Sequence, residues 1–203
     1  MSGSISIKRL SGAELEPYIA SLARLRIAVF RDFPYLYDGS FEYEQKYLQT
    51  YVKSKDSVII LALDGEEVIG ASTGLPMEHE TAEFQRPFIE NGYDPASVFY
   101  CGESVLLKAY RGKGIYKQFF LGREGKAREL GRFDYCSFCC VQRPPDHPLR
   151  PADYVPLDAV WTKFGYVKHP ELHTTYTWKD VNEAAETAKP MVFWLKSIKE
   201  TNP

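Results

Sequence analysis

Apolar residues recur at strand and helix spacings in the first third of the chain. Ile5 and Ile7 alternate with polar residues, which predicts a short strand. Residues 14–30 and 42–53 carry apolar side chains three and four positions apart, which predicts two amphipathic helices. The first of these is expected to end before Pro34, because the residue preceding a proline is disfavoured in helical backbone conformation.

A hairpin and a further strand are predicted next. Two β-rich runs, 57–63 and 68–73, flank Asp64-Gly65, a strong hairpin signal. Residues 76–97 contain three prolines and a glycine, so we expect them to be irregular. Aromatic and β-branched residues predict a strand over 98–107.

The second half of the chain again alternates between helix and strand. Residues 115–130 are a predicted helix with Gly131 placed as its C-cap, and 135–141 are a predicted buried strand. Five prolines between 143 and 156 predict a stiff loop. The remaining predicted elements are a short helix and two strands, at 157–164, 174–178 and 191–195.

This order of elements predicts one α/β domain around a mixed central sheet. The hairpin makes the sheet antiparallel in its first part. The fourth and fifth strands flank the 115–130 helix, so we expect them to be parallel. The 203 residues show no internal repeat and no break in composition, which favours a single domain over 1–203.

Composition narrows the function classes. The chain has 25 Lys and Arg against 27 Asp and Glu, a net charge of −2, and so lacks the basic excess of a nucleic-acid binder. Its longest apolar run, 58–63, is too short to cross a membrane, and the N-terminus has no signal-peptide pattern. Cys136, Cys139 and Cys140 lie on one predicted strand, whose alternating faces prevent them from sharing a metal ion. We expect buried, reduced thiols, no metal site and a cytoplasmic protein, with thiol-redox activity as the alternative.

The turn at 111–114 carries the clearest chemical signal. Gly112 and Gly114 permit positive φ, and the N-terminus of the following helix offers N–H groups that suit a pyrophosphate. The segment is not a mononucleotide P-loop, because it lacks Gly-Lys-Ser/Thr. It is not Gly-x-Gly-x-x-Gly either, because position 117 is lysine. A glycine turn without a ligand is the alternative interpretation.

Two segments carry a resemblance to a known family. Residues 111–116 resemble motif A, [Gln/Arg]-x-x-Gly-x-[Gly/Ala], of the GCN5-related N-acetyltransferases, the GNAT superfamily. Residues 160–166 are similar to the family's Phe-Tyr-x-x-x-Gly-Phe segment. The resemblance implies a GNAT-like sheet whose fourth and fifth strands splay apart. It also implies an enzyme that transfers an acetyl or other acyl group from acetyl-CoA to an amine.

The resemblance assigns a CoA site. Backbone groups of Leu106 would hold the pantetheine arm in the gap between the fourth and fifth strands. Acetyl-CoA is then a cosubstrate, and no metal is expected. The residues expected to cradle its pyrophosphate are Arg111, Gly112, Lys113, Gly114, Ile115 and Tyr116.

Two positions depart from the family pattern. Tyr116 replaces the last Gly/Ala of motif A, and we expect its side chain to point away from the phosphates because its amide does the binding. Trp161, which we group with the CoA-binding residues, stands where many relatives have the tyrosine that protonates the CoA thiolate. An indole N–H does not ionise near neutral pH, so Tyr154 becomes our candidate for the acid.

Glu103 is our candidate for the general base. It is a carboxylate within an apolar strand, eight residues before Arg111, where relatives often carry Asp or Glu. Burial of this carboxylate would raise its pKa toward the range useful for taking a proton from an ammonium group. A strand carboxylate paired with an arginine or lysine is the alternative.

Three further residues are candidates for binding the acceptor. Tyr35 and Tyr37 lie between the first two helices, and His147 lies in the proline-rich loop; the resemblance places both segments beside the acceptor site. Core packing and a structural loop are the respective alternatives. The expected acceptor is a small-molecule, peptide or protein amine of unknown identity, and a homodimer is left open. The alternative function is a CoA-binding module without catalysis.

Overall fold

A seven-stranded sheet organises the structure, a computed structural model that describes residues 4–199. Its strands lie in the order β1-β2-β3-β4-β5-β7-β6. Neighbouring strands run antiparallel except β4 and β5, which are parallel, as the sequence predicts. The strands are β1 (Ile5–Leu10), β2 (Val58–Asp64), β3 (Glu67–Pro76), β4 (Val98–Leu106), β5 (Tyr135–Val141), β6 (Val167–Trp178) and β7 (Thr187–Ser197).

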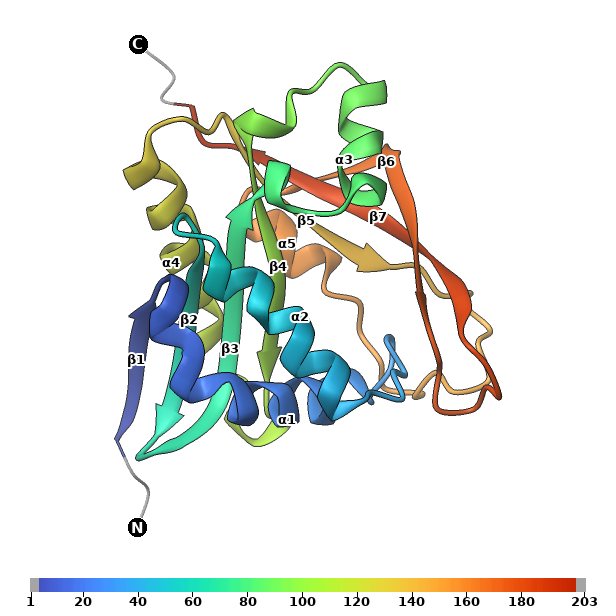
Figure 1. Ribbon diagram of the computed structural model, residues 1–203. Helices are drawn as coiled ribbons and strands as arrows, with labels where there is room; N and C mark the ends of the chain where they lie inside the picture. The colour runs from blue at the N-terminus through green and yellow to red at the C-terminus, as the bar shows by residue number, and fades with distance from the viewer. Residues whose placement is uncertain (1–3, 200–203) are drawn as a thin grey trace.

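The parallel strands separate soon after they meet. β4 and β5 pair only over Val98–Tyr100 and Tyr135–Ser137. Beyond Tyr100, β4 remains paired with β3, while β5 remains paired with β7. The two strands therefore diverge and leave a gap in the sheet, which confirms the predicted splay (Figure 1).

Helices cover both faces of the sheet (Figure 1). The helices α1 (Ile19–Phe30), α2 (Phe41–Lys53) and α3 (Ala82–Glu90) contribute to one apolar core cluster. On the opposite face, α4 (Ile115–Leu130) and α5 (Asp158–Lys163) pack into a second cluster. No helix within residues 4–199 is long and apolar enough to cross a membrane.

The cysteines follow the predicted alternation along β5. Cys139 belongs to the first core cluster, whereas Cys136 and Cys140 belong to the second. All four cysteines are buried and free. The described part of the chain holds no group of three or more side chains that could bind a metal ion.

The helix after the glycine turn has the bounds that the sequence predicts. Gly131 follows α4 with φ 68°, the left-handed C-cap conformation expected of it. Gly122 faces β2, and a Cβ at this position would lie 2.4 Å from Cδ1 of Ile60. The missing side chain therefore lets α4 pack closely against the sheet.

The expectation that residues 76–97 are irregular was wrong, because they contain α3. Phe84 and Phe88, one helical turn apart, are both buried in the first core cluster. Pro87 lies inside the helix and has no N–H to donate to the carbonyl of Glu83. That carbonyl instead accepts a hydrogen bond of 2.9 Å from the hydroxyl of Thr174 in β6. The hydrogen bond that Pro87 cannot donate is therefore replaced by one from Thr174, on a strand distant in sequence.

Other elements differ from the prediction at their ends. The predicted 14–30 helix is divided into a 3-10 segment, Gly12–Tyr18, which contains Pro17, and α1. The sixth strand begins at Val167, earlier than expected, with a shift in its pairing between His169 and His173. The seventh strand extends beyond the predicted 191–195 at both ends.

Candidate active site

The glycine turn before α4 has an open, left-handed backbone. Gly112 and Gly114 have φ of 79° and 78°, and a Cβ on either would meet no atom within 4 Å. Gly114 is the N-cap of α4, and within residues 4–199 no side chain caps this helix end. Uncapped N–H groups at an exposed helix N-terminus suit a phosphate group. The geometry therefore fits the predicted pyrophosphate cradle.

Contacts on either side anchor this turn. The hydroxyl of Tyr110 donates to Asp64 at 2.8 Å, which ties the turn to the β2–β3 hairpin. The Lys113 ammonium lies 4.9 Å from the centre of the Tyr110 ring. Arg111 Nε donates to the carbonyl of Leu106 at 3.4 Å. The turn is thereby fixed beside the end of β4.

Leu106 presents its backbone to the gap in the sheet. The neighbouring Leu107 N–H donates to the carbonyl of Ile69, at 3.0 Å, on the β3 side. Successive residues of a strand direct their backbone groups to opposite sides. The Leu106 groups therefore face the side from which β5 has diverged, where an extended ligand can pair with them.

The two residues that depart from the family pattern contact each other. Trp161 Nε1 donates to the hydroxyl of Tyr116 at 3.0 Å. The Tyr116 ring packs edge-on against Phe120 of α4, with ring centres 5.1 Å apart, and Trp161 packs against Phe138 of β5 at the same separation. The Tyr116 side chain thus packs against the second core cluster and away from the glycine turn.

Glu103 lies in a buried charge cluster on the other face of β4. Its carboxylate forms an ion pair of 2.5 Å with Arg26 of α1, which also pairs with Glu44 of α2. The side chains of Glu103, Glu44 and Arg26 are 3%, 1% and 9% exposed. One oxygen of each glutamate has no hydrogen-bond partner in the described part of the chain. Glu103 is therefore paired with an arginine, and its part in catalysis stays a prediction.

Comparison with known proteins identifies the fold. No family model and no curated protein sequence matches the chain. Solved structures match it over almost its whole length. A Streptococcus pneumoniae acetyltransferase of the GNAT family is 12% identical with a TM-score of 0.57, covering 97% of this chain and 100% of that chain. The chain has the GNAT fold.

Two other solved structures with this fold contain ligands. The Salmonella typhimurium protein yncA, solved with its cofactor acetyl-CoA, is 8% identical with a TM-score of 0.59, covering 99% of this chain and 98% of that chain. Arabidopsis thaliana NAA60, solved with a bisubstrate analogue, is 14% identical with a TM-score of 0.59, covering 97% of this chain and 100% of that chain. These TM-scores and coverages show that the GNAT fold is shared.

In this GNAT fold, Tyr35 and Tyr37 have different surroundings. The ring of Tyr35 packs between Phe30 and Trp178, with ring centres 4.7 and 6.0 Å away. Burial raises the pKa of Tyr35, as do nearby groups that include Cys139 and Glu103 on the two splayed strands. For Tyr37, burial raises the pKa of the hydroxyl, and the Glu44 carboxylate of α2 adds to this. Both tyrosines pack against the first core cluster, and their part in acceptor binding stays a prediction.

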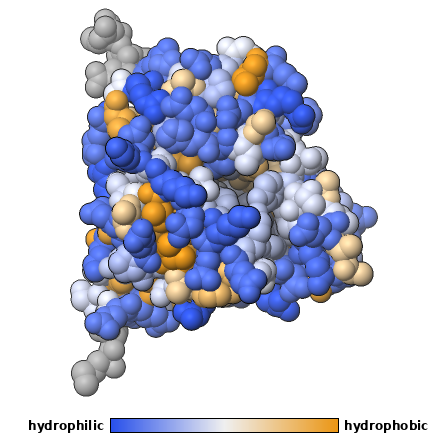
Figure 2. Space-filling model, in the orientation of Figure 1, coloured by the Kyte–Doolittle hydropathy of each residue, from blue (hydrophilic) through white to orange (hydrophobic). Residues whose placement is uncertain are grey.

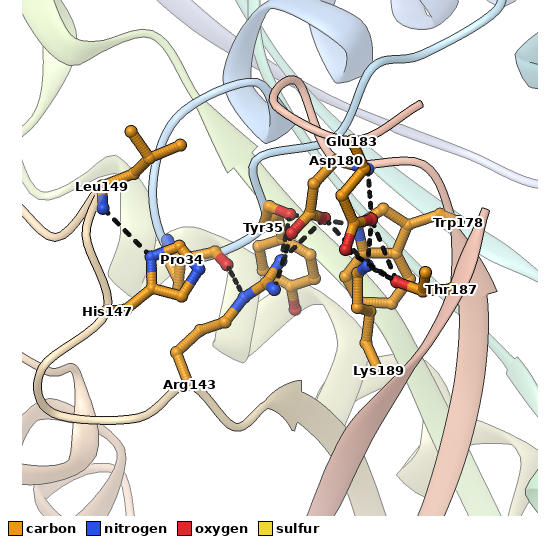
Figure 3. A network of polar contacts seen from close by, with 10 residues as sticks. All are labelled: Pro34, Tyr35, Arg143, His147, Leu149, Trp178, Asp180, Glu183, Thr187 and Lys189. Carbon is orange, nitrogen blue, oxygen red and sulfur yellow. Dashed lines mark hydrogen bonds and ion pairs between the residues drawn. The ribbon is translucent and has the colours of Figure 1, made fainter. Parts of the chain in front are cut away.

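Arg143 joins the proline-rich loop to the segment that carries Tyr35 (Figure 3). Its guanidinium donates to the carbonyls of Pro34 and Tyr35, both at 2.8 Å. It also forms a buried ion pair of 2.7 Å with Asp180, which follows β6. Lys189 of β7 lies 3.5 Å from the same carboxylate. One arginine therefore holds together the proline-rich loop, the segment after α1 and the segment after β6.

Tyr154 and His147 both lie near Phe33. The rings of Tyr154 and Phe33 pack edge-on at 4.6 Å, and burial raises the pKa of the Tyr154 hydroxyl. His147 lies 5.7 Å from the Phe33 ring, and its Nδ1 accepts a hydrogen bond from the Leu149 N–H at 3.2 Å (Figure 3). The structure places the predicted acid and one predicted acceptor residue beside the same phenylalanine ring, and their roles stay predictions.

The sequence analysis missed the charged residues that organise this region. Arg26 had a visible signal, because it lies four residues after Leu22 and three before Val29 on the apolar side of the helix. A charged residue within an apolar stripe is typical of a buried ion pair. Arg143 carried no such signal, since it lies in a segment predicted to be a loop.

Proposed function

We propose that the protein is an N-acetyltransferase that moves an acetyl group from acetyl-CoA to the amine of a small molecule, peptide or protein. The observation that carries this proposal is the gap between β4 and β5 beside the uncapped glycine turn. Such an arrangement can hold an extended acyl-CoA molecule by its pyrophosphate at one end. The acyl group at the other end is then presented to the opposite face of the sheet. The GNAT fold of solved acetyltransferases supports the same function.

Each part of the site has a role in this proposal. Backbone groups of residues 111–116 bind the pyrophosphate, those of Leu106 hold the pantetheine arm, and Trp161 supports the cradle through Tyr116. Tyr35, Tyr37 and the loop containing His147 border the acceptor side. Preorganised binding of both substrates would make acyl transfer effectively unimolecular.

Acyl transfer also needs proton movements. The acceptor must lose a proton before it can attack, and the departing thiolate gains one. Glu103 is the base that the sequence provides, and the oxygen that Arg26 leaves free is available to take a proton from the acceptor nitrogen. Tyr154 is the proposed donor for the second step, because a tyrosine hydroxyl carries its proton at neutral pH.

Acetyl-CoA binding and turnover test the proposal separately. Calorimetry is expected to show acetyl-CoA binding, and a thiol-release assay over a panel of primary amines is expected to show turnover with at least one of them. Binding without turnover on any amine would instead favour a CoA-binding module. Absence of binding would remove the proposal altogether.

A further inference from the structure

Glu80 lies at the point where the sheet opens. It follows a short 3-10 turn, Met77–His79, between β3 and α3. The side chains of His79 and Ser54 share a hydrogen bond of 3.0 Å, which fixes this turn to the end of α2. Gln85 Nε2 donates to the Glu80 carbonyl at 2.7 Å and fixes it to α3. The backbone of Glu80 is therefore held between two helices.

The same turn lies against the last paired residue of β4. Leu75 is opposite Tyr100 in the β3–β4 pairing, and Tyr100 is where β4 parts from β5. The ring of Phe84 packs against both Tyr100 and Tyr176, with ring centres 5.5 Å away in each case. Glu80 thus lies on the face of the sheet opposite α4, at the acceptor end of the gap. Figure 2 shows this surface hollowed between the parts of the molecule that carry α2 and α3 in Figure 1.

Tyrosine hydroxyls from several elements converge on this space. Tyr47 and Tyr51 of α2 share a hydrogen bond of 3.0 Å, and the Tyr100 hydroxyl lies 3.1 Å from the thiol of Cys139 in β5. The hydroxyls of Tyr43 and Tyr176 lie 2.6 Å apart and join α2 to β6. Burial raises the pKa of five of these groups and the charge of Glu80 adds to the rise: Tyr47 and Tyr51 from α2, Tyr100 from β4, Cys139 from β5 and Tyr176 from β6. The Glu103 carboxylate of β4, which is paired with Arg26 of α1, acts on Glu80 in turn. His79 and Glu83 are the other titratable residues close to Glu80 in its own segment.

The electrostatics agree with this placement. Burial raises the pKa of Glu80 to about 7, and the nearby Glu103 carboxylate adds to the effect, while a hydrogen bond from the Thr81 N–H opposes it. Independently, Glu103 Oε1 is a buried polar atom with no hydrogen-bond partner in residues 4–199. Buried polar groups are normally paired, so an unpaired carboxylate oxygen beside a gap indicates a place for a ligand that donates hydrogen bonds.

We propose that this tyrosine-lined space receives the acceptor as an ammonium ion and that Glu80 takes its proton. The inference rests on the proposed function and names its substrate class: a primary alkylamine with no carboxylate next to the nitrogen. Carboxylates and phenol rings both attract an ammonium ion. Arg26 is already paired with two glutamates, so we expect Glu80 and Glu103 to repel an acceptor carboxylate more than Arg26 attracts it.

The proposed step balances without any further reactant. One N–H bond of the ammonium breaks, and its proton passes to the Glu80 carboxylate. The free nitrogen lone pair attacks the thioester carbonyl carbon, the C–N bond forms, and the C–S bond breaks with its electron pair leaving on sulfur. The nitrogen loses a second proton, to the free oxygen of Glu103, as the amide forms, and Tyr154 or water delivers a proton to the thiolate. Glu80 and Glu103 then return their protons to solvent, from which Tyr154 recovers its own.

The variant Glu80→Gln tests the role of this carboxyl, with Glu66→Gln in the exposed hairpin as its matched control. Glu80→Gln is expected to lower kcat with n-butylamine by roughly 10²–10³-fold, to leave acetyl-CoA affinity unchanged, and to remove the acidic limb near pH 7 from the kcat/KM profile. The control is expected to match the wild type. Wild-type turnover and an unchanged acidic limb in Glu80→Gln would overturn the proposal.

The substrate class has its own test. Norvaline is n-butylamine with a carboxylate on the carbon that bears nitrogen, so the pair isolates the effect of that charge. We expect kcat/KM to be at least tenfold higher for n-butylamine than for norvaline, and this ratio should be smaller in Glu80→Gln. Equal kcat/KM values for the two amines, or a higher value for norvaline, would overturn the proposed substrate class.

A direct titration separates this inference from the proposed function. Infrared difference spectra of wild type against Glu80→Gln, taken without acetyl-CoA or amine, are expected to show a carboxyl group that ionises near pH 7. Ionisation near the ordinary value for glutamate would overturn the inference even in an active enzyme. If this carboxyl ionises near pH 7 but the wild type acetylates no amine, the proposed function fails and the catalytic role of Glu80 fails with it.

Discussion

Trp161 and Tyr116, the two residues that depart from the GNAT motifs, are joined by a hydrogen bond of 3.0 Å from the indole Nε1 to the phenol oxygen. The bond ties α5 to the first turn of α4, which follows the glycine turn. The bulky residue in motif A therefore has its partner in the other motif segment. We interpret the two departures as one coupled change that keeps the cradle in place.

A double-mutant cycle tests this coupling. Tyr116→Phe and Trp161→Phe each remove the hydrogen bond, and each is expected to lower the free energy of unfolding, with a coupling of about 1 kcal/mol between them. Tyr116→Phe keeps the backbone amide, so acetyl-CoA affinity should stay near that of the wild type. Chemical denaturation and calorimetry measure the two quantities. Additive effects on stability would contradict the coupling.

The glycine turn gives a second prediction. Gly112→Val and Gly114→Val are expected to abolish acetyl-CoA binding, because a Cβ at positive φ strains the turn and crowds the space for the pyrophosphate. Gly92→Val is the matched control, since Gly92 also has positive φ (81°) and open space around it but lies far along the chain from the turn. All three should lose similar stability, and only the first two should lose affinity in calorimetry. Equal affinity in all three would remove the pyrophosphate assignment.

The elements that the sequence predicted best are those whose signals are local. The bounds of α4 follow from Gly114 and Gly131 at its two ends, and the splay follows from the family resemblance. In contrast, α3 depends on the hydroxyl of Thr174, which replaces the bond that Pro87 cannot make. No pattern within residues 76–97 could reveal a partner on a distant strand.

The parts of the candidate site also differ in how far the sequence could predict them. The glycine turn is contiguous in sequence, so its open geometry could be expected from Gly112 and Gly114 alone. The pairing partner of Glu103 could not be expected from the sequence, because Arg26 lies in α1, 77 positions earlier in the chain. Charge clusters formed by separate elements become visible only when the fold places those elements together.

Glu103 allows a third prediction, in which structure and chemistry are measured separately. Glu103→Gln leaves Arg26 with one carboxylate, and breaking a buried pair costs about 3–5 kcal/mol, so the unfolding midpoint should fall. If Glu103 also takes a proton, kcat should fall by roughly 10²–10⁴-fold in protein that is still folded. Glu44→Gln is the control, because it breaks the other half of the same cluster. Equal kcat losses in the two variants would assign Glu103 a structural role.

Arg143 gives a fourth prediction, about the position of the proline-rich loop. Arg143→Met removes the guanidinium that joins Pro34, Tyr35 and Asp180, and it leaves Asp180 with Lys189 as its remaining cation. We expect a loss of about 3 kcal/mol in stability and a higher KM for the acceptor, with acetyl-CoA affinity unchanged. Denaturation and steady-state kinetics measure these effects. Reduced acetyl-CoA affinity with unchanged acceptor KM would contradict the placement of the loop on the acceptor side.

The last prediction concerns how Glu80 couples stability to pH. Burial raises its pKa from 4.5 to about 7 in the folded protein, so folding favours the protonated carboxyl. The resulting stability is fully present below about pH 4.5, and it is lost as the pH rises through 7, where the folded protein must hold a buried carboxylate. Glu80→Gln cannot ionise and escapes this loss.

The stability of Glu80→Gln relative to the wild type should therefore increase between pH 4.5 and 7.5 and then level off. The full shift in pKa corresponds to about 3 kcal/mol, which is the upper limit of the gain. Thermal unfolding of both proteins across this pH range measures it, with Glu66→Gln expected to follow the wild type throughout. Parallel curves for wild type and Glu80→Gln would show that the carboxyl is not held in a low-dielectric site. A gain in stability together with a loss of turnover would instead mark Glu80 as a residue kept at a cost to the fold for the chemistry it performs.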